Sequence, residues 1–189
     1  MAEGRLGWMN TPAQGNRLPS GQIWAADNGK FGKGWPGVHR WLRWLDAHAD
    51  RAPDCLFAVA PDVPMDAAAT LKESVPYLEP IRERGYPAAF AAQDGAEEVG
   101  VPWGEFDVLF LAGSTEWKLG PAARQLAADA RERDVPVHMG RVNSRKRLRY
   151  ADQIGSATAD GTFVAFAPDV NLARCLRWIS DLDREATLF

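Results

Sequence analysis

The chain of 189 residues is poor in the side chains that build disulfide frameworks and metal sites. It contains only two cysteines, Cys55 and Cys175, and three histidines. Two thiols cannot form a multi-disulfide scaffold or a four-thiolate zinc site, and the histidines show no metal-ligand spacing. We therefore expect no metal and no cofactor, and a reducing cytoplasm as the location of the protein.

The sequence also lacks long apolar runs and an excess of positive charge. No uninterrupted apolar run approaches the ~20 residues of a transmembrane helix, and the polar start has no signal-peptide core. The formal net charge of −3 argues against bulk electrostatic binding to nucleic acid or to an anionic membrane. We expect no membrane partner, and any anion site must be local.

What is present is the mixture of an ordinary globular protein, with 46% hydrophobic and 25% charged residues. The length favours a single domain over residues 1–189. Short apolar runs alternate with stretches of helical periodicity, which predicts parallel strands joined by helical crossovers. The expected strands are Arg5–Met9, Gln22–Ala26, Cys55–Ala60, Pro87–Ala92, Val108–Ala112, Val135–Met139 and Ala157–Ala159.

Helices are expected between these strands. Helical periodicity covers Val38–Ala49 and Asn171–Leu182. Asp66 is a candidate cap for one helix, Pro121 is a candidate first residue of another, and Asn143 or Ser144 is a candidate cap for a third.

Unusual polar residues follow directly on most of the expected strands. An open sheet would spread them along one edge, whereas a barrel collects all strand ends on one face. We therefore predict a minimal TIM-like (β/α) barrel with parallel strands and short or missing units. The segments concerned are 27–28, 62, 93–94, 113–115, 141–143 and 160–162.

Three carboxylates, Asp27, Asp62 and Asp160, lie at expected strand ends. A single aspartate after a strand is most often a helix cap. Three together, two of them among small neighbours, suit displacement at a sugar anomeric carbon, where one carboxylate attacks while another manages protons. His138, inside a strand, is interpreted as packed rather than catalytic. Ser114 is equally suited to a turn or to donating to a flat base edge.

A basic segment follows the sixth expected strand, with five cations between Arg141 and Arg149. Cations in the first turn of a helix oppose the helix macrodipole by roughly 0.3 to 1 kcal/mol each. Backbone phosphates of a polynucleotide would compensate them, and a solvated face paired to nearby carboxylates explains them equally well. The candidate phosphate-binding residues are Arg141, Asn143, Arg145, Lys146, Arg147 and Arg149.

Six motifs in order resemble the DpdA family of deazapurine-in-DNA transglycosylases, which are relatives of the tRNA-guanine transglycosylases. The resemblance runs from about Gly7 to Trp178. The motifs are Trp24-Ala25-Ala26-Asp27-Asn28-Gly29-Lys30-Phe31, Ala60-Pro61-Asp62-Val63-Pro64, Ala91-Ala92-Gln93-Asp94-Gly95, Ala112-Gly113-Ser114-Thr115-Glu116-Trp117, His138-Met139-Gly140-Arg141-Val142-Asn143 and Ala159-Asp160-Gly161-Thr162.

The resemblance implies a barrel that cleaves the N-glycosidic bond of a nucleotide in a polymer. By motif position, Asp160 matches the attacking aspartate and Asp27 matches the acid/base carboxylate. Asp62 and Gln93 match residues that read the base edge, and Gly113 matches part of a loop that seals the pocket. We add Asn28 and Ser114 to the expected base-binding residues.

The chain departs from the tRNA enzymes in ways that bear on its substrate. It has neither the Cys/Cys/Cys/His zinc ligands nor the C-terminal extension that carries them, and Gly113-Ser114-Thr115 replaces their double-glycine loop. The small size removes the surface that grips tRNA. The expected partner is therefore DNA, with a flipped or single-stranded nucleotide, together with a free nucleobase if the base is exchanged.

Two outcomes of the expected reaction stay open at this point. The enzyme either exchanges a base for a deazapurine or hydrolyses the bond, as a DNA glycosylase that excises a modified base from phage DNA would. A non-catalytic nucleic-acid-binding barrel and a barrel enzyme acting on a small sugar phosphate are further alternatives. For contacts to a flipped nucleotide, Trp24 and Trp117 join the basic segment as candidates.

Overall fold

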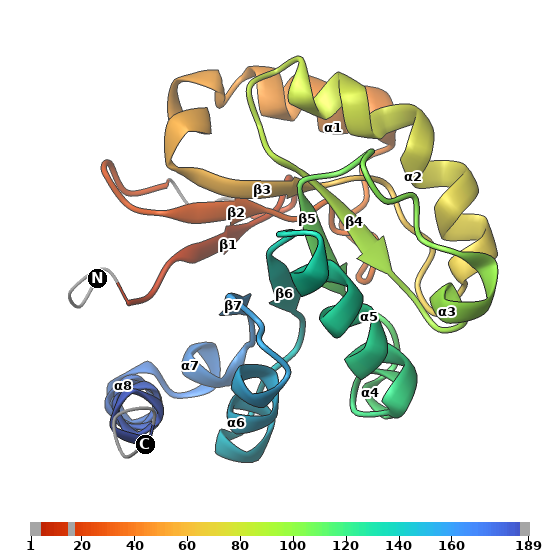
Figure 1. The fold of residues 1–189 in the computed structure, drawn as a ribbon. Coiled ribbons are helices and arrows are strands. Elements are labelled where there is room, and N and C mark those ends of the chain that lie inside the picture. The colour runs from red at the N-terminus through yellow and green to blue at the C-terminus, as the bar shows by residue number, and fades with distance from the viewer. Residues whose placement is uncertain (1–4, 15–17, 186–189) are drawn as a thin grey trace.

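The computed structural model describes residues 5–14 and 18–185. Seven parallel strands follow one another in sequence order across a single sheet, which curls into a half-barrel (Figure 1). The predicted TIM-like barrel with parallel strands is therefore confirmed, and all seven predicted strands are present; each is shorter than predicted, and β1 also extends one residue beyond the predicted end, to Asn10. They are β1 (Trp8–Asn10), β2 (Trp24–Ala26), β3 (Cys55–Val59), β4 (Ala88–Ala92), β5 (Val108–Leu111), β6 (Val137–Met139) and β7 (Thr158–Ala159).

The helices begin where local capping chemistry favours a start. The Asp66 carboxylate accepts from the amide of Ala69 at 2.9 Å, and the Ser144 hydroxyl accepts from the amide of Arg147 at 3.3 Å. Of the two predicted caps for the latter helix, Ser144 is therefore the one used. The helices are α1 (Val38–Asp46), the 3₁₀ helix η2 (Ala49–Asp54), α2 (Ala67–Arg82), α3 (Ala96–Val99), α4 (Thr115–Lys118), α5 (Pro121–Glu132), α6 (Arg145–Gln153), α7 (Phe163–Phe166) and α8 (Pro168–Glu185).

Two predicted helix boundaries were wrong. The first helix ends at Asp46 instead of Ala49, and a 3₁₀ helix that contains Pro53 follows it. The last helix begins at Pro168, three residues before the predicted start, because proline is well tolerated at a first helical position.

Two apolar clusters lie on opposite faces of the sheet. The larger one joins the outer face to the helices and contains Trp24, Trp41 and Tyr86. The smaller one has Phe57 and Val59 at its centre, with small residues such as Ala89 beside them. Because side chains alternate along a strand, this second cluster fills the concave side of the half-barrel and supports the strand ends from below.

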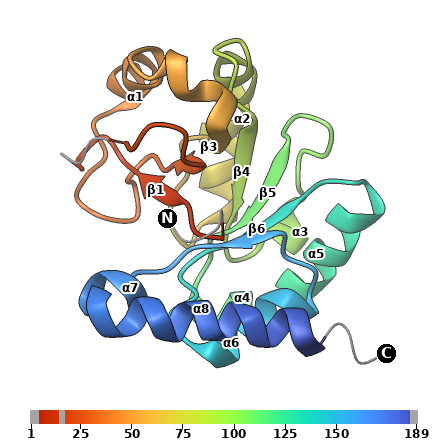
Figure 2. The ribbon, with the colours of Figure 1, turned by 90° about the vertical axis from the view of Figure 1, so that its left-hand side faces the viewer.

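The half-barrel is open, because β1 and β7 are both edge strands of the sheet. Helix α8 lies along one side of the molecule, next to α6 and α7 (Figure 2). The Arg5 guanidinium, which precedes β1, donates to the Ser180 hydroxyl of α8 at 2.8 Å. The two ends of the chain are thus tied together although no strand pair closes the barrel.

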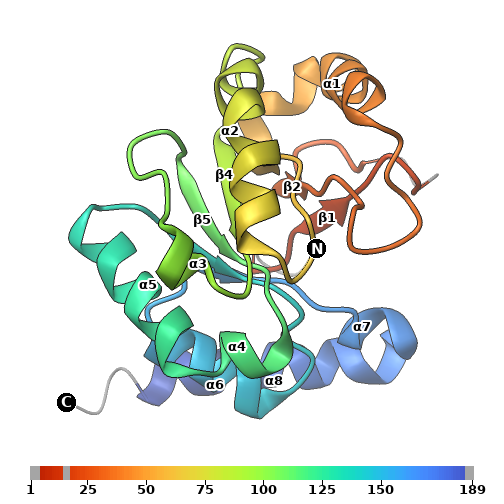
Figure 3. The ribbon, with the colours of Figure 1, turned by 90° about the vertical axis from the view of Figure 1, so that its right-hand side faces the viewer.

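The carboxyl ends of the strands face one end of the molecule. The short helices α3, α4 and α7 follow β4, β5 and β7 directly, and Figure 3 shows α3 and α4 near each other with α7 farther away. In a parallel barrel this is the face where functional residues from different strands meet.

Candidate functional site

The first carboxylate of the site, Asp27, comes directly after β2. One of its oxygens accepts from the amide of Gly29 at 3.3 Å, a turn that the positive φ of Gly29 (80°) allows. Burial is the main cause that raises the pKa of Asp27 from 3.8 to about 6, and the negative charges of Asp62 and Asp160 contribute to the same rise. Asp27 therefore holds or releases a proton near neutral pH, as an acid/base group must.

A second carboxylate, Asp62, is held between two side-chain amides. Asn28 donates to one oxygen at 2.8 Å and Gln93 donates to the other at 2.7 Å. The amide orientations are fixed in turn, since Asn28 also donates to the carbonyl of Ala60 and Gln93 accepts from the amide of Met65. Burial raises the pKa of Asp62. The structure thus brings together three of the residues predicted to read the base edge.

The third carboxylate, Asp160, follows β7 and keeps a quarter of its side chain exposed (25%). Its Oδ1 lies 3.1 Å from Nε2 of His138 and accepts from the amide of Arg141 at 3.3 Å. Gly140 permits this approach, because a Cβ there would lie only 2.6 Å from the ring of Phe110 and 3.3 Å from Oδ1 of Asp160. His138 is packed as predicted, but sequence reasoning missed its contact with Asp160.

Gly113 allows a close approach behind the site. A Cβ at this position would lie 2.5 Å from the indole of Trp117 and 2.6 Å from the carboxylate of Asp94. Ser114 donates to that carboxylate through both its amide and its hydroxyl, and the hydroxyl also caps α4 by accepting from the amide of Trp117. The hydroxyl of Ser114 therefore has internal partners, in keeping with the turn interpretation.

Lys118 is a buried cation that sequence reasoning missed. Its ammonium group donates to the carbonyl of Gly140 at 2.5 Å, and its side chain is almost fully enclosed. Burial, together with the positive charge of Arg141, lowers the pKa of Lys118 to about 7, against the opposing effect of Asp160. The sequence feature that could have identified Lys118 is its position, one helical turn after the cap residue of the short helix that follows β5.

Arg141 spans several of the strand ends. Its guanidinium donates to the carbonyls of Ala112, at 2.9 Å, and Gly113, and it lies 4.4 Å from the ring centroid of Phe31. Its φ is 60°, an unusual backbone conformation for a residue other than glycine. Such strain is found where the surrounding structure holds a residue in place for function.

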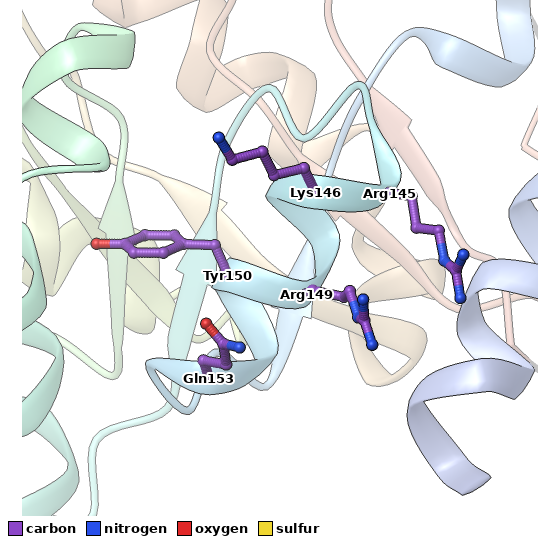
Figure 4. A pocket seen from close by; sticks show the side chains of 5 residues that line it. All are labelled: Arg145, Lys146, Arg149, Tyr150 and Gln153. Atoms are coloured by element: carbon purple, nitrogen blue, oxygen red, sulfur yellow. The ribbon is translucent and has the colours of Figure 1, made fainter. Parts of the chain in front are cut away.

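The remaining residues of the basic segment lie on or beside α6. Arg145 pairs with Asp181 of α8 at 2.7 Å, and Arg147 donates to the carbonyl of Arg141. Figure 4 shows Arg145 and Arg149 directed toward α8, with Lys146 and Tyr150 on the other side of the helix. A hollow of about 440 Å³ is lined by Arg145, Lys146, Arg149, Tyr150 and Gln153.

The side chain of Asn143 points into the loop that follows β7. Its carbonyl oxygen accepts from the amide of Phe163 at 3.1 Å, next to Gly161, where a Cβ would lie 2.6 Å from that oxygen. Asn143 therefore links the loops after β6 and β7.

One predicted nucleotide contact was wrong. Trp24 is completely buried, and its indole donates to the carbonyl of Arg51 at 2.8 Å, so its ring cannot stack on a base. It packs instead against Trp44 and Tyr86 in the outer core. Trp117 is half-buried and donates to Glu97 at 2.9 Å.

Within residues 5–14 and 18–185, no cluster of three or more His, Cys, Asp or Glu side chains is arranged to hold a metal ion. In the same part of the chain, no helix is long and apolar enough to cross a membrane.

Comparisons with known proteins place the fold and leave the family unassigned. No family model and no curated protein matches the sequence significantly. The solved structure of the Bacillus subtilis YkuI protein, which has an EAL domain and was crystallised with its substrate c-di-GMP and calcium, is similar in fold. It shares 13% identity with this chain at a TM-score of 0.50. The match covers 91% of this chain and 45% of YkuI, so the chain spans less than half the length of that protein.

Proposed function

We propose that this protein cleaves the N-glycosidic bond of a nucleotide in DNA, as a base-exchanging transglycosylase for deazapurines. The observation that supports the proposal is that Asp27 and Asp160 follow β2 and β7 directly and lie near enough for the charge of Asp160 to act on Asp27. Their charges interact, one carboxyl is buried with its pKa raised to about 6, and the other is partly exposed with one oxygen held by donors. This pairing supplies one group to attack and one to carry the proton.

The proposed reaction has two halves. Asp160 attacks C1′ of the nucleotide, the electron pair of the C1′–N bond leaves with the base, and Asp27 protonates the departing base. An incoming base then gives its proton to Asp27 and attacks C1′, which releases the Asp160 carboxylate. Because the raised pKa of Asp27 lies near neutral pH, the same group serves in both halves.

The Asp62 cluster fits recognition of a base edge. With Asn28 and Gln93 each donating one bond to Asp62, its oxygens still have lone pairs for N–H groups of a purine-like ring. A site that pairs every donor of its ligand rejects analogues that lack one. This is the basis for expecting a particular purine or deazapurine.

Hydrolysis is the second candidate, favoured by the open side of the half-barrel between β1 and β7. Water that reaches the sugar after the first half-reaction would release an abasic site instead of an exchanged product. The two outcomes share Asp160 and Asp27 and differ in what attacks second.

The test is mass spectrometry of free bases and nucleosides after incubation of the protein with unmodified and phage-modified DNA, with and without added 7-deazapurines. Incorporation of the added base supports exchange, and a released base with an abasic site supports hydrolysis. The absence of both products with every one of these DNAs would overturn the proposal.

Asp160→Asn is expected to abolish base release while the fold and the DNA affinity stay near wild type, because the lost group acts chiefly in the transition state. Single-turnover rates and binding titrations measure the two effects. Asp152→Asn, an exposed carboxylate on α6, is the matched control and should keep full activity. A wild-type rate in Asp160→Asn would refute the assignment.

A further inference from the structure

A chain of side chains behind Asp160 has no role in the reaction described above. Nδ1 of His138 lies 2.8 Å from the hydroxyl of Thr158, and Nε2 lies 3.1 Å from Oδ1 of Asp160. His138 and Thr158 are register partners on β6 and β7, and Asp160 lies two residues beyond Thr158. Because side chains on a strand alternate, this spacing places all three on one face of the sheet.

The surroundings leave the imidazole of His138 few other partners. The ring is 3% exposed and packs edge-on against Phe110, with ring centroids 4.7 Å apart, and against Phe57 at 4.8 Å. An ionised carboxylate only accepts hydrogen bonds, so Nε2 must donate to Asp160. A neutral ring protonated at Nε2 then accepts at Nδ1 from the hydroxyl of Thr158, and both contacts are satisfied.

These contacts make the two oxygens of Asp160 unequal. Oδ1 receives the donor from His138 and the amide of Arg141, 3.1 and 3.3 Å away. Two donors on one oxygen fix the rotation of the carboxyl group and reduce the nucleophilicity of that oxygen. Oδ2 is then the oxygen better suited to attack.

We propose that His138 is a positioning residue that orients Asp160 for attack through Oδ2, and that Thr158 holds His138 in the required tautomer. The proposal rests on the proposed function. In the first half-reaction the Oδ2–C1′ bond forms and the C1′–N bond breaks, and in the second the Oδ2–C1′ bond breaks. The proton on Nε2 stays on His138 throughout.

The donor from His138 is expected to matter most in the second half-reaction. Negative charge is absent from the ester between Asp160 and the sugar and returns when the carboxylate leaves. Nε2–H stabilises that returning charge, so its loss should slow breakdown of the covalent intermediate. A variant without the donor should therefore accumulate a protein–DNA adduct.

The first test needs no activity and reads the tautomer directly. Nitrogen NMR of the protein labelled with ¹⁵N-histidine, at pH 7.5, is expected to show His138 with Nε2 protonated and Nδ1 bare. The signals are assigned by their loss in His138→Gln. Thr158→Ser should preserve the pattern and Thr158→Val should alter it. A proton on Nδ1, whether alone or in an imidazolium, would overturn the proposal.

The second test compares His138→Leu, which has no donor, with His138→Gln, whose amide nitrogen can reach the place of Nε2. We expect His138→Leu to lower turnover about 10- to 100-fold, the effect of losing a charge-assisted hydrogen bond, and to raise the adduct fraction on denaturing gels. His138→Gln should recover most of the rate. Equal rates in the two variants, or a slow His138→Leu without more adduct, would count against the role of the donor.

If His138→Leu does not fold, a comparison of Thr158→Val with Thr158→Ser tests the same proposal. Thr158→Val should turn over more slowly than Thr158→Ser at unchanged DNA affinity, and equal rates would overturn the role of Thr158. If the wild-type protein releases no base from any DNA, the proposed function fails. The NMR result then still decides whether the arrangement of His138 and Asp160 exists.

Discussion

Burial shifts the pKa values of two ionisable side chains at the carboxyl ends of the strands. The pKa of Asp27 is raised to about 6, and that of Lys118 is lowered to about 7. Perturbed groups of opposite sign on one face of a barrel are typical of functional sites. Because the pKa of Asp27 is raised in the folded state, Asp27 should make the free energy of unfolding depend on pH.

Asp27→Asn should stabilise the protein more at pH 7.5 than at pH 4.5. The native pKa of about 6 exceeds the ordinary 3.8, so the folded state binds the proton more tightly and wild-type stability falls as pH rises from about 4 through 6. The variant lacks this loss, so its advantage should grow by about 2 kcal/mol between the two pH values. Urea unfolding measures the change. An advantage equal at both pH values would show that the pKa is not raised.

The same substitution should change catalysis. Removal of the proton-transfer group should lower base release and alter the shape of the pH–rate profile as well as its height. Rates across pH 5 to 8 test this expectation for Asp27→Asn against the Asp152→Asn control. An unaltered shape would make Asp27 structural.

Two substitutions of Arg141 distinguish the effect of its backbone strain on stability from the effect of its side chain on turnover. Glycine adopts the φ of 60° without cost, and alanine does not. Both Arg141→Gly and Arg141→Ala lose the guanidinium contacts with Ala112, Gly113 and Phe31, so both should lower turnover more than DNA affinity. Arg141→Gly should be more stable than Arg141→Ala by up to about 1 kcal/mol in thermal or urea unfolding. The reverse order would argue against strain.

At the scale of elements, the short helices after the strands do most to shape the site. Helix α4 holds Lys118 against the carbonyl of Gly140, so it links the ends of β5 and β6. Helix α6 follows β6 after a short loop, with Arg145 and Arg149 directed toward α8 and Lys146 directed away from it. The element that carries the basic segment is thus anchored to the proposed catalytic face at its first turn.

The cations of α6 should contribute unequally to DNA binding. Arg145 is paired with Asp181, whereas Lys146 is exposed and directed away from α8 (Figure 4). Lys146→Gln should flatten the salt dependence of binding by roughly 0.7 to 0.9 log units for one phosphate contact, and Arg145→Gln should flatten it less. Binding titrations at several salt concentrations compare the two. An unchanged slope in both variants would leave the segment as a solvated face.

At the scale of the whole molecule, seven strands make a half-barrel whose two edge strands stay unpaired with each other. The likeness to YkuI in fold extends over 91% of this chain, at an identity too low to carry function. The activity must therefore be argued from the site itself. The open side has one consequence for that site, since it gives solvent a path that a closed barrel would not.

Removal of metal ions should leave the protein intact. The sequence has two cysteines and three histidines without the spacing of metal ligands. The melting temperature is expected to be the same with and without EDTA. Stoichiometric zinc in the purified protein, measured by elemental analysis, would contradict this expectation.

Features that depend on residues close together in the chain could be predicted from the sequence. Apolar runs marked all seven strands, and Asp66, Pro121 and the pair Asn143 and Ser144 marked helix starts, because caps and strand patterns act over a few residues. The rule that parallel strands collect their ends on one face also predicted that Asp27, Asp62 and Asp160 gather at one end, and the charges of Asp62 and Asp160 do act on Asp27.

Contacts between side chains far apart in the sequence could not be predicted, because they depend on the packed fold. Register between β6 and β7 brings His138 to Asp160 across 22 positions, and the packing of α4 brings Lys118 to Gly140. The burial of Trp24 is also a result of tertiary packing, since residues distant in the sequence cover its side chain. Such contacts depend on how whole elements pack, which a local pattern of residues does not encode.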